Sequence, residues 1–234
     1  MKKIYLIDDN IDGNRQKYGG GFVDDGTYQD VLIAIDKLSP SDDLSFVNEA
    51  ACVLFHKSLL DYIDGQFRDG STKVKSRLQA MPLLGDVIPF VKFSDGDTSD
   101  IGDYKNRTIY SLSKRALYSR LEAFVLHYQK TNEIELKILA YGQNYTTYLV
   151  DRAVTLLFNH LQEFENDEYL SASKVHCKEF EQIIMLSQPA IGKTYKDIVI
   201  GLQMNPITVR EFKHRINSIL DNFQDYGKNY YTWK

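Results

Sequence analysis

The chain has 234 residues, 43% of them hydrophobic and 26% charged, which is typical of a globular protein with one large domain or two small ones. Its two cysteines, Cys52 and Cys177, exclude a disulfide framework, no apolar run approaches the ~20 residues that cross a bilayer, and no signal sequence opens the chain, so we expect a cytoplasmic protein with reduced thiols and no membrane partner. The net charge of −4 excludes a surface that is basic throughout.

The first predicted element is a strand at residues 3–7, an apolar run that ends at Asp8 and Asp9. Two adjacent carboxylates after a strand either bind a cation or face solvent. Residues 12–27 are expected to form a loop with three consecutive glycines, which either cradle an anion or only make the loop flexible. A helix is expected at residues 28–38.

A second clear strand is predicted at residues 50–55, and His56 follows it directly. This histidine is open to three interpretations: a loop histidine with satisfied hydrogen bonds, a contact to a ligand, or a catalytic group. Residues 71–80 predict a basic helix, and residues 86–93 predict the next strand, which ends at Ser94.

Residues 95–104 carry four aspartates and two glycines. They lack the order and the closing glutamate of an EF-hand calcium loop, so a solvated loop is the better prediction. Residues 107–112 predict a further strand, which is followed by Lys114, and residues 116–129 predict an amphipathic helix.

This order of elements resembles a receiver domain, the input domain of two-component response regulators. Asp8 and Asp9 match the acidic pair that holds Mg²⁺ there, and Ser94 and Lys114 match the residues that contact the phosphoryl group. A receiver has its phosphate-accepting aspartate where this chain has His56, which cannot form an acyl phosphate. The resemblance therefore implies a pseudo-receiver that aspartyl phosphate does not switch and that binds Mg²⁺ weakly or not at all. The domain would then be locked in one state, or a partner protein or a small ligand at the glycine loop would switch it.

Beyond this part, residues 133–141 alternate between apolar and polar and predict one more strand. Residues 146–164 predict a long helix. The additional strand and helix either extend the sheet or belong to a dimer interface, for which the helices at residues 116–129 and 146–164 are the candidates. Residues 165–167 are the expected linker.

The C-terminal region has the pattern of a helix-turn-helix after a helix at residues 170–187. Thr194 suits the N-cap of a first short helix, and Met204 is expected to be an inward plug in the turn. Pro206 suits the first residue of a second helix that Asn205 caps. The buried stripe of that helix repeats every three or four residues: Val209, Phe212, Ile216 and Leu220.

This stretch resembles the helix-turn-helix of LuxR-type regulators, the output domain of many response regulators. The match has no gap and includes Gly192-Lys193-Thr194, Lys196-Asp197-Ile198, Leu202, Met204, Thr208-Val209 and Arg215-Ile216. The chain departs from the family at Val199, where a small residue is usual, and at Gln203, which replaces the turn glycine. The resemblance implies a homodimer that binds double-stranded DNA. The expected DNA contacts are Thr208, Arg210, Lys213, His214 and Arg215.

The distribution of charge favours DNA binding by this region. Residues 1–130 hold 17 Lys+Arg against 19 Asp+Glu, residues 131–173 hold 2 against 7, and residues 174–234 hold 9 against 6. Only the last segment is basic, as binding to phosphates requires. Because its excess is small, useful affinity would need dimerisation.

Tests for other chemistry in the sequence are negative. Gly192-Lys193-Thr194 lacks the first glycine of a phosphate-binding loop, and no strand precedes it. The five histidines show no zinc-binding spacing, and the chain has no nucleophile elbow. We therefore expect neither an enzyme nor a bound cofactor.

These patterns predict an α/β flavodoxin-like, receiver-like domain at residues 1–165 and a small all-α helix-turn-helix domain at residues 166–234. The predicted function is a DNA-binding transcriptional regulator of the response-regulator type. One alternative is a protein–protein signalling adaptor that does not bind DNA. The other is a small-ligand sensor or enzyme that uses the carboxyl edge of the sheet, around Asp8, Asp9, His56 and Lys114.

Overall fold

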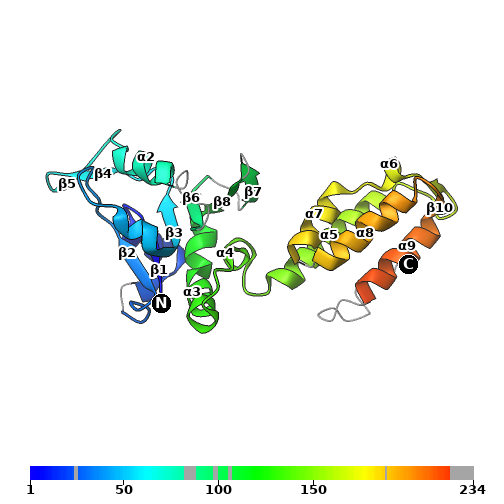
Figure 1. The fold of residues 1–234 in the computed structure, drawn as a ribbon, viewed down its shortest axis with the longest axis horizontal. Helices are drawn as coiled ribbons and strands as arrows, with labels where there is room; N and C mark the ends of the chain where they lie inside the picture. Colours follow the sequence, from blue (N-terminus) through cyan, green and yellow to red (C-terminus); the bar gives the residue numbers. More distant parts are fainter. Residues whose placement is uncertain (24–25, 82–87, 97–99, 105–106, 188, 222–234) are drawn as a thin grey trace. The chain divides into compact units, whose positions relative to one another are not determined.

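The computed structural model describes residues 1–221, apart from residues 24–25, 82–87, 97–99, 105–106 and 188 (Figure 1). Contacts between residues divide the chain into two compact units, Met1–Gln143 and Asn144–Lys234. The sequence places the domain boundary later, between residues 165 and 166. The two boundaries differ because α5 (Tyr145–Leu161) packs against α7 (Lys178–Ser187) and so lies in the second unit.

The first unit contains a six-stranded sheet in the order β2-β1-β3-β6-β8-β7. Its parallel strands are β2 (Leu32–Ile35), β1 (Lys3–Ile7), β3 (Ala50–His56), β6 (Phe90–Ser94) and β8 (Arg107–Ser113). Taken in chain order, these parallel strands have the arrangement 2-1-3-4-5 of a flavodoxin-like sheet. The predicted fold class is confirmed. An antiparallel strand, β7 (Asp100–Tyr104), forms the edge beside β8.

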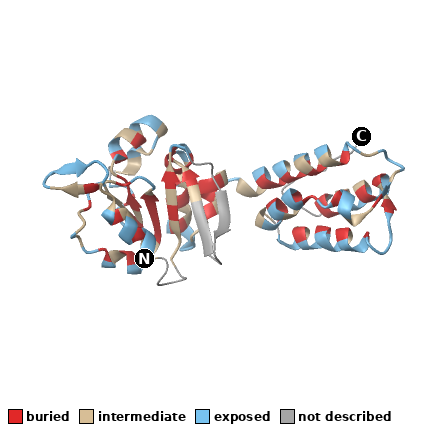
Figure 2. Ribbon diagram, turned by 90° about the horizontal axis from the view of Figure 1, so that it is seen from above, coloured by how far each residue is buried: buried red, intermediate tan, exposed pale blue. Residues whose placement is uncertain are grey.

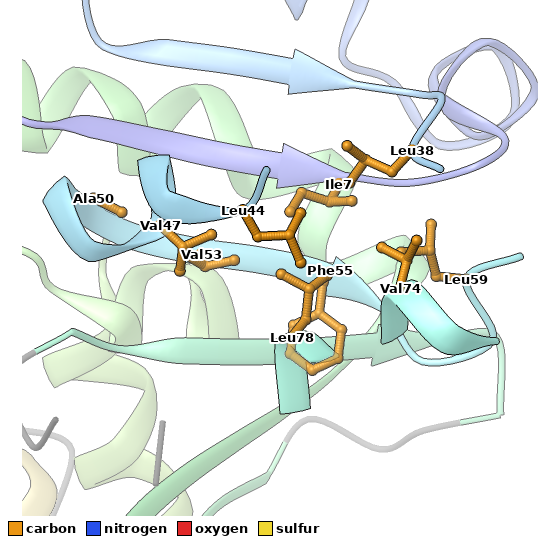
Figure 3. Close-up of a cluster of buried hydrophobic side chains, with 10 residues drawn as sticks. All are labelled: Ile7, Leu38, Leu44, Val47, Ala50, Val53, Phe55, Leu59, Val74 and Leu78. Carbon is orange, nitrogen blue, oxygen red and sulfur yellow. The ribbon is translucent and has the colours of Figure 1, made fainter. Parts of the chain in front are cut away.

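A cluster of buried apolar side chains covers one face of this sheet (Figure 3). It joins β1 and β3 to the short 3-10 helix η2 (Ser45–Glu49) and to α2 (Lys73–Ala80), which contributes two residues spaced one helical turn apart. Its members are Ile7, Leu38, Leu44, Val47, Ala50, Val53, Phe55, Leu59, Val74 and Leu78. Each large side chain buried here stabilises the unit by about 1.5–3 kcal/mol.

Two helices that pack on each other, α1 (Ile11–Tyr18) and α3 (Lys114–Thr131), contribute further core residues to the first unit. The inward residues of α3 repeat at helical spacing and are almost inaccessible to solvent: Leu117, Tyr118, Leu121, Phe124 and Val125. Side chains of successive strand residues point to opposite faces. Asp8 and His56 therefore share a face with Tyr118, on the side opposite the cluster in Figure 3.

Two predictions at the start of the chain are wrong. Residues 12–27 were expected to be a loop, but α1 begins at Ile11, and its buried side includes the polar Asn14. Residues 28–38 were expected to be a helix, but they contain β2. The apolar run Leu32–Ile35 pairs in parallel with Ile4–Ile7, because β-branched residues suit a strand buried against its neighbour.

Two further predictions in the first unit need correction. The expected loop at residues 95–104 contains β7, which pairs with β8 through backbone hydrogen bonds. The expected strand at residues 133–141 is instead a short helix, α4 (Leu136–Tyr141), that packs on α3. The Glu135 side chain accepts a hydrogen bond from the Lys137 amide and caps α4, a contact that alternation alone does not reveal.

The second unit is helical, with one two-stranded sheet. Its helices are α5, α6 (Ala172–Val175), α7, α8 (Pro189–Gly201) and α9 (Val209–Asp221), and its strands are β9 (Tyr169–Leu170) and β10 (Ile207–Thr208). The single helix expected at residues 170–187 is thus divided into β9, α6 and α7. Buried residues follow one side of the longer helices and exposed residues the other (Figure 2).

The helix-turn-helix differs locally from its sequence pattern. Thr194 lies inside α8, where its hydroxyl donates to the Ala190 carbonyl at 2.9 Å, so it is not an N-cap. Met204 is 84% exposed and does not plug the turn. Asn205 and Pro206 precede β10, and the cap of α9 is Thr208, whose hydroxyl accepts from the Glu211 amide at 3.3 Å. The predicted buried stripe of the second helix is confirmed at Val209, Phe212, Ile216 and Leu220.

A two-stranded hairpin, β4 (Asp61–Ile63) and β5 (Gln66–Arg68), lies between β3 and α2. It turns through Asp64 and Gly65, both with positive φ. Among the helices that the structure describes, none is both long and apolar enough to cross a membrane.

Candidate functional site

The carboxyl edge of the parallel sheet brings together Asp8, Asp9 and His56, which we name the edge cluster. Asp8 and Asp9 follow β1, and His56 ends β3, the neighbouring strand, where Ile7 lies opposite Phe55. Nδ1 of His56 lies 2.7 Å from Oδ1 of Asp9 and 3.5 Å from Oδ1 of Asp8. The Asp8 side chain is fully buried, and those of Asp9 and His56 are 10% and 12% exposed.

Both carboxylates of the edge cluster are held by neighbouring donors. Oδ2 of Asp8 accepts hydrogen bonds from the Asn14 side-chain amide and from the Tyr118 hydroxyl, each at 2.6 Å. Oδ2 of Asp9 accepts from the Leu60 backbone amide at 3.2 Å. The donors come from α1, α3 and the loop after β3. The orientation of both carboxylates is therefore fixed by three segments of the first unit.

Aromatic packing positions the remaining member of the cluster. The His56 ring stacks on Phe93 of β6, with ring centroids 5.7 Å apart, and Phe93 meets Tyr118 edge-on at 6.2 Å. The imidazole of His56 is thus held by a hydrogen bond to the Asp9 carboxylate and by stacking on the Phe93 ring. Of the three interpretations open for His56 in the sequence, its geometry fits a histidine with a satisfied hydrogen bond.

The environment of the edge cluster shifts the pKa of Asp9 and the pKa of Tyr118. Burial is the largest influence on Asp9 and raises its pKa, but the hydrogen bond and charge of His56 and the Leu60 amide together outweigh it, so the pKa is lowered. Burial raises the pKa of Tyr118, and the negative charge of Asp8 raises it further. Asp9 is therefore ionised and Tyr118 is a hydroxyl donor at neutral pH.

Ser94 and Lys114 lie at the same end of the sheet as the edge cluster. Ser94 is the last residue of β6 and pairs with Ser113 of β8, and Lys114 begins α3 directly after its N-cap Ser113. Nζ of Lys114 lies 3.9 Å from Oδ2 of Asp95, and the Tyr18 hydroxyl donates to the other oxygen of Asp95 at 2.9 Å. The Lys114 side chain is only 8% exposed, so its ammonium group lies in a largely buried site.

The sequence indicated five residues of this edge and missed two that matter to its geometry. Asn14 was placed in a loop, and Tyr118 was not singled out within the helix predicted at residues 116–129. Tyr118 could have been found, because it lies one helical turn after Lys114 and must share its side of α3. Asn14 gave no signal, since its contact with Asp8 depends on a helix that the sequence pattern did not predict.

The other candidate site is the exposed face of α9. Arg210, His214 and Arg215 are exposed, while Phe212 and Ile216 of the same helix are fully buried. Arg215 pairs with Glu211 one turn earlier at 2.7 Å. The remaining predicted contacts, Thr208 and Lys213, are half-buried. The five predicted DNA contacts thus differ in exposure, and three of them have open positions.

The segment before β9 lies against the start of α9. The Asn166 carbonyl accepts from the Arg210 amide, and the Glu168 carbonyl accepts from the Val209 amide, both at 2.9 Å. The Lys213 ammonium donates to the Asn166 side-chain oxygen at 2.9 Å. These bonds occupy the first amides of α9, which a helix N-terminus otherwise offers to a phosphate. Any anion bound at this helix must therefore be contacted by side chains.

Comparison of the chain with protein-family models, with curated proteins and with solved structures finds no match. Its function must be inferred from the edge cluster and from the exposed face of α9.

Proposed function

We propose that this protein is a DNA-binding transcriptional regulator of the response-regulator type, with α9 as the helix that enters the major groove. The main support is the exposed basic face of α9, which presents Arg210, His214 and Arg215 while its apolar stripe is buried in the second unit. An α-helix fits the major groove, and arginine is the side chain best suited to phosphates and to guanine edges.

The exposed face of α9 needs little rearrangement to accept DNA. Arg215 pairs with Glu211, and both side chains are about half exposed, so the ion pair is worth less than about 1 kcal/mol. A phosphate group can replace Glu211 as the partner of Arg215 at small cost. Lys213 has a different role, because it ties α9 to Asn166 and is less available to DNA.

The proposed regulator acts as a homodimer. One helix-turn-helix contacts only one half-site, and useful affinity normally comes from two. The sequence offered the helices at residues 116–129 and 146–164 as an interface. Their large apolar residues, such as Leu121 and Leu157, are buried inside their own units. We therefore expect the two copies to meet through exposed side chains of these helices, such as the half-exposed Tyr148.

Duplexes selected from a random-sequence pool provide the test, with binding followed by fluorescence anisotropy at several salt concentrations. The double variant Arg210→Ala/Arg215→Ala should bind more weakly by about 1–3 kcal/mol for each arginine that reads a base. If both instead contact phosphates, the salt slope should fall by about two. Light scattering on the same samples should give two chains per duplex.

The matched control is Arg115→Ala/Lys130→Ala, which removes two positive charges from exposed positions of α3 in the first unit. It should leave DNA affinity unchanged. Equal weakening in both double variants would mean that only net charge matters. If selection with the unaltered protein at low salt yields no duplex that binds, the proposal is refuted and a signalling adaptor is the better interpretation.

A further inference from the structure

The two-stranded ribbon of β9 and β10 adjoins the start of α9, the helix proposed to enter the major groove. Its register pairs Leu170 with Ile207 and Tyr169 with Thr208. Residues opposite each other in an antiparallel pair lie on the same face, and successive residues of a strand point to opposite faces. Leu170 and Ile207 are buried, whereas Tyr169 is exposed and Thr208 is half-buried. Tyr169 and Thr208 therefore share the outer face of the ribbon.

The outer face of the ribbon lies beside the first turn of α9. Thr208 caps this helix, and the next residue, Val209, donates its amide to the Glu168 carbonyl at 2.9 Å. An α-helix with its side chains is about 10–12 Å across and the major groove is about 12 Å wide, so a helix in the groove leaves no room for a second segment. When the first turn of α9 contacts base edges, the ribbon must therefore lie against the sugar–phosphate backbone that borders the groove.

Tyr169 offers a hydrogen-bond donor on this side of α9. Its side chain is 67% exposed, more than any other aromatic side chain that the structure describes, so its phenol is open to a partner from outside. Among the described residues, the Tyr169 hydroxyl has no hydrogen-bond partner. The cations beside it are already engaged, because Lys174 pairs with Glu168 at 2.6 Å and Lys213 donates to Asn166 at 2.9 Å.

We propose that the hydroxyl of Tyr169 donates a hydrogen bond to a DNA phosphate at the border of the groove that α9 enters, and that this contact positions the helix on the duplex. The inference rests on the proposed function and adds a contact outside the predicted set, which begins at Thr208. Tyrosine hydroxyls that bind phosphates fix the orientation of a protein on DNA without reading its sequence. The exposed acids Glu165 and Asp167 precede Tyr169 and repel phosphates, so the contribution of this hydrogen bond is moderate.

The test uses the whole chain, a selected duplex and the same duplex with one base pair changed, with anisotropy measured at several salt concentrations. Tyr169→Phe should weaken binding to both duplexes equally, by about 10-fold, because a hydrogen bond to a charged acceptor is lost and no base contact changes. The salt slope should stay the same, since a neutral hydroxyl releases no counterion. Tyr169→Lys should restore the affinity and steepen the salt slope by about one, because its ammonium group replaces a counterion at the same phosphate.

Tyr62→Phe is the matched control, since it removes one hydroxyl from a half-buried tyrosine of β4 in the first unit and should leave DNA affinity unchanged. Urea unfolding should give one midpoint for Tyr169→Phe and the unaltered chain, because an exposed side chain is altered.

Unchanged affinity in Tyr169→Phe, together with weaker binding by Arg210→Ala/Arg215→Ala, would overturn this inference and leave the proposed function standing. An unchanged salt slope in Tyr169→Lys, a loss in Tyr169→Phe that is confined to one duplex, or an equal loss in Tyr62→Phe would also overturn it. If the unaltered chain binds no selected duplex, this inference and the proposed function are refuted together.

Discussion

Asp61 is a fully buried carboxylate whose hydrogen bonds connect the β4–β5 hairpin to the start of α2. Its oxygens accept from the Ser71 hydroxyl at 2.6 Å and from the amides of Lys73 and Val74, each at 2.9 Å. Burial raises its pKa, but these donors, with the charge of Lys73, outweigh burial and lower the pKa below 3.8. The residue therefore serves α2 as an N-terminal cap.

We predict that Asp61→Asn lowers the free energy of unfolding by about 1–3 kcal/mol at neutral pH, because buried donors lose a charged acceptor. The sign of the pH effect follows from the lowered pKa. The stabilisation is complete above pH 3.8, the ordinary value, and is lost as the pH falls through the lower value of the folded state. Urea unfolding should show this acid loss in the unaltered protein and a smaller loss in Asp61→Asn.

The control for this prediction is Asp64→Asn in the turn of the same hairpin. The Asp64 side chain is 82% exposed, and asparagine tolerates its positive φ, so its replacement should change stability by less than about 0.5 kcal/mol. Equal effects of the two substitutions would show that the buried hydrogen bonds of Asp61 are not what stabilises α2.

At the scale of elements, the sequence predicted best those segments whose buried face is mainly apolar. The strands β1 and β3 and the helix α3 have clear apolar patterns in the sequence, and the structure contains all three. The helix α1 was missed because its buried positions are only Ile11 and Asn14, and a polar inward residue has no hydrophobic period. Its partner, Asp8, was recognised without the helix that orients it.

Segments of ambiguous period failed for a different reason. Residues 28–38 and 133–141 are apolar enough for either type of element, and only their neighbours decide. Leu32–Ile35 is a strand because it pairs with β1. Leu136–Tyr141 packs on α3 as a helix. Tertiary context thus decided the type of element in both cases, as a strand in the first and as a helix in the second.

The two threonines of the helix-turn-helix provide a test of how α8 and α9 begin. We predict that Thr208→Ala lowers the free energy of unfolding by about 1 kcal/mol, because its hydroxyl accepts from the Glu211 amide at the start of α9. Thr194→Ala should be neutral or slightly stabilising, because Thr194 lies within α8, where alanine is the better helix former. Urea unfolding of both variants measures the difference.

Thr208→Ser is the control, since serine keeps the capping hydroxyl and should retain the stability that alanine loses. The sequence pattern alone has Thr194 as an N-cap, and it therefore predicts that Thr194→Ala loses more stability than Thr208→Ala. A loss of about 1 kcal/mol in Thr194→Ala with no loss in Thr208→Ala would therefore show that α8 begins near Thr194 and that α9 is capped elsewhere.

At the scale of the whole molecule, the first unit has the sheet of a receiver and a different chemistry at its carboxyl edge. The strand order and the positions of Asp8, Asp9 and Lys114 fit the fold that the resemblance implied. At the end of β3, however, the imidazole of His56 bonds to Asp9 where a carboxylate acceptor would be needed. We therefore predict that aspartyl phosphate does not switch this unit.

We predict that a small phosphodonor with Mg²⁺ changes neither the mass of this chain nor its affinity for a selected duplex. Acyl phosphate formation needs a carboxylate nucleophile and an oxygen-rich Mg²⁺ site, and His56 removes both. Intact-mass measurement and anisotropy on one sample check the two outcomes together.

His56→Asp is the matched variant, since it restores a third carboxylate beside Asp8 and Asp9 and should gain one phosphoryl group. A gain of mass by the unaltered chain would contradict the prediction, and its loss in Asp9→Ala would place the true acceptor at this edge. If neither chain gains mass, more than the missing carboxylate separates this edge from phosphoryl transfer, and Asn14 and Tyr118, which hold Asp8 in place, become the residues to change next.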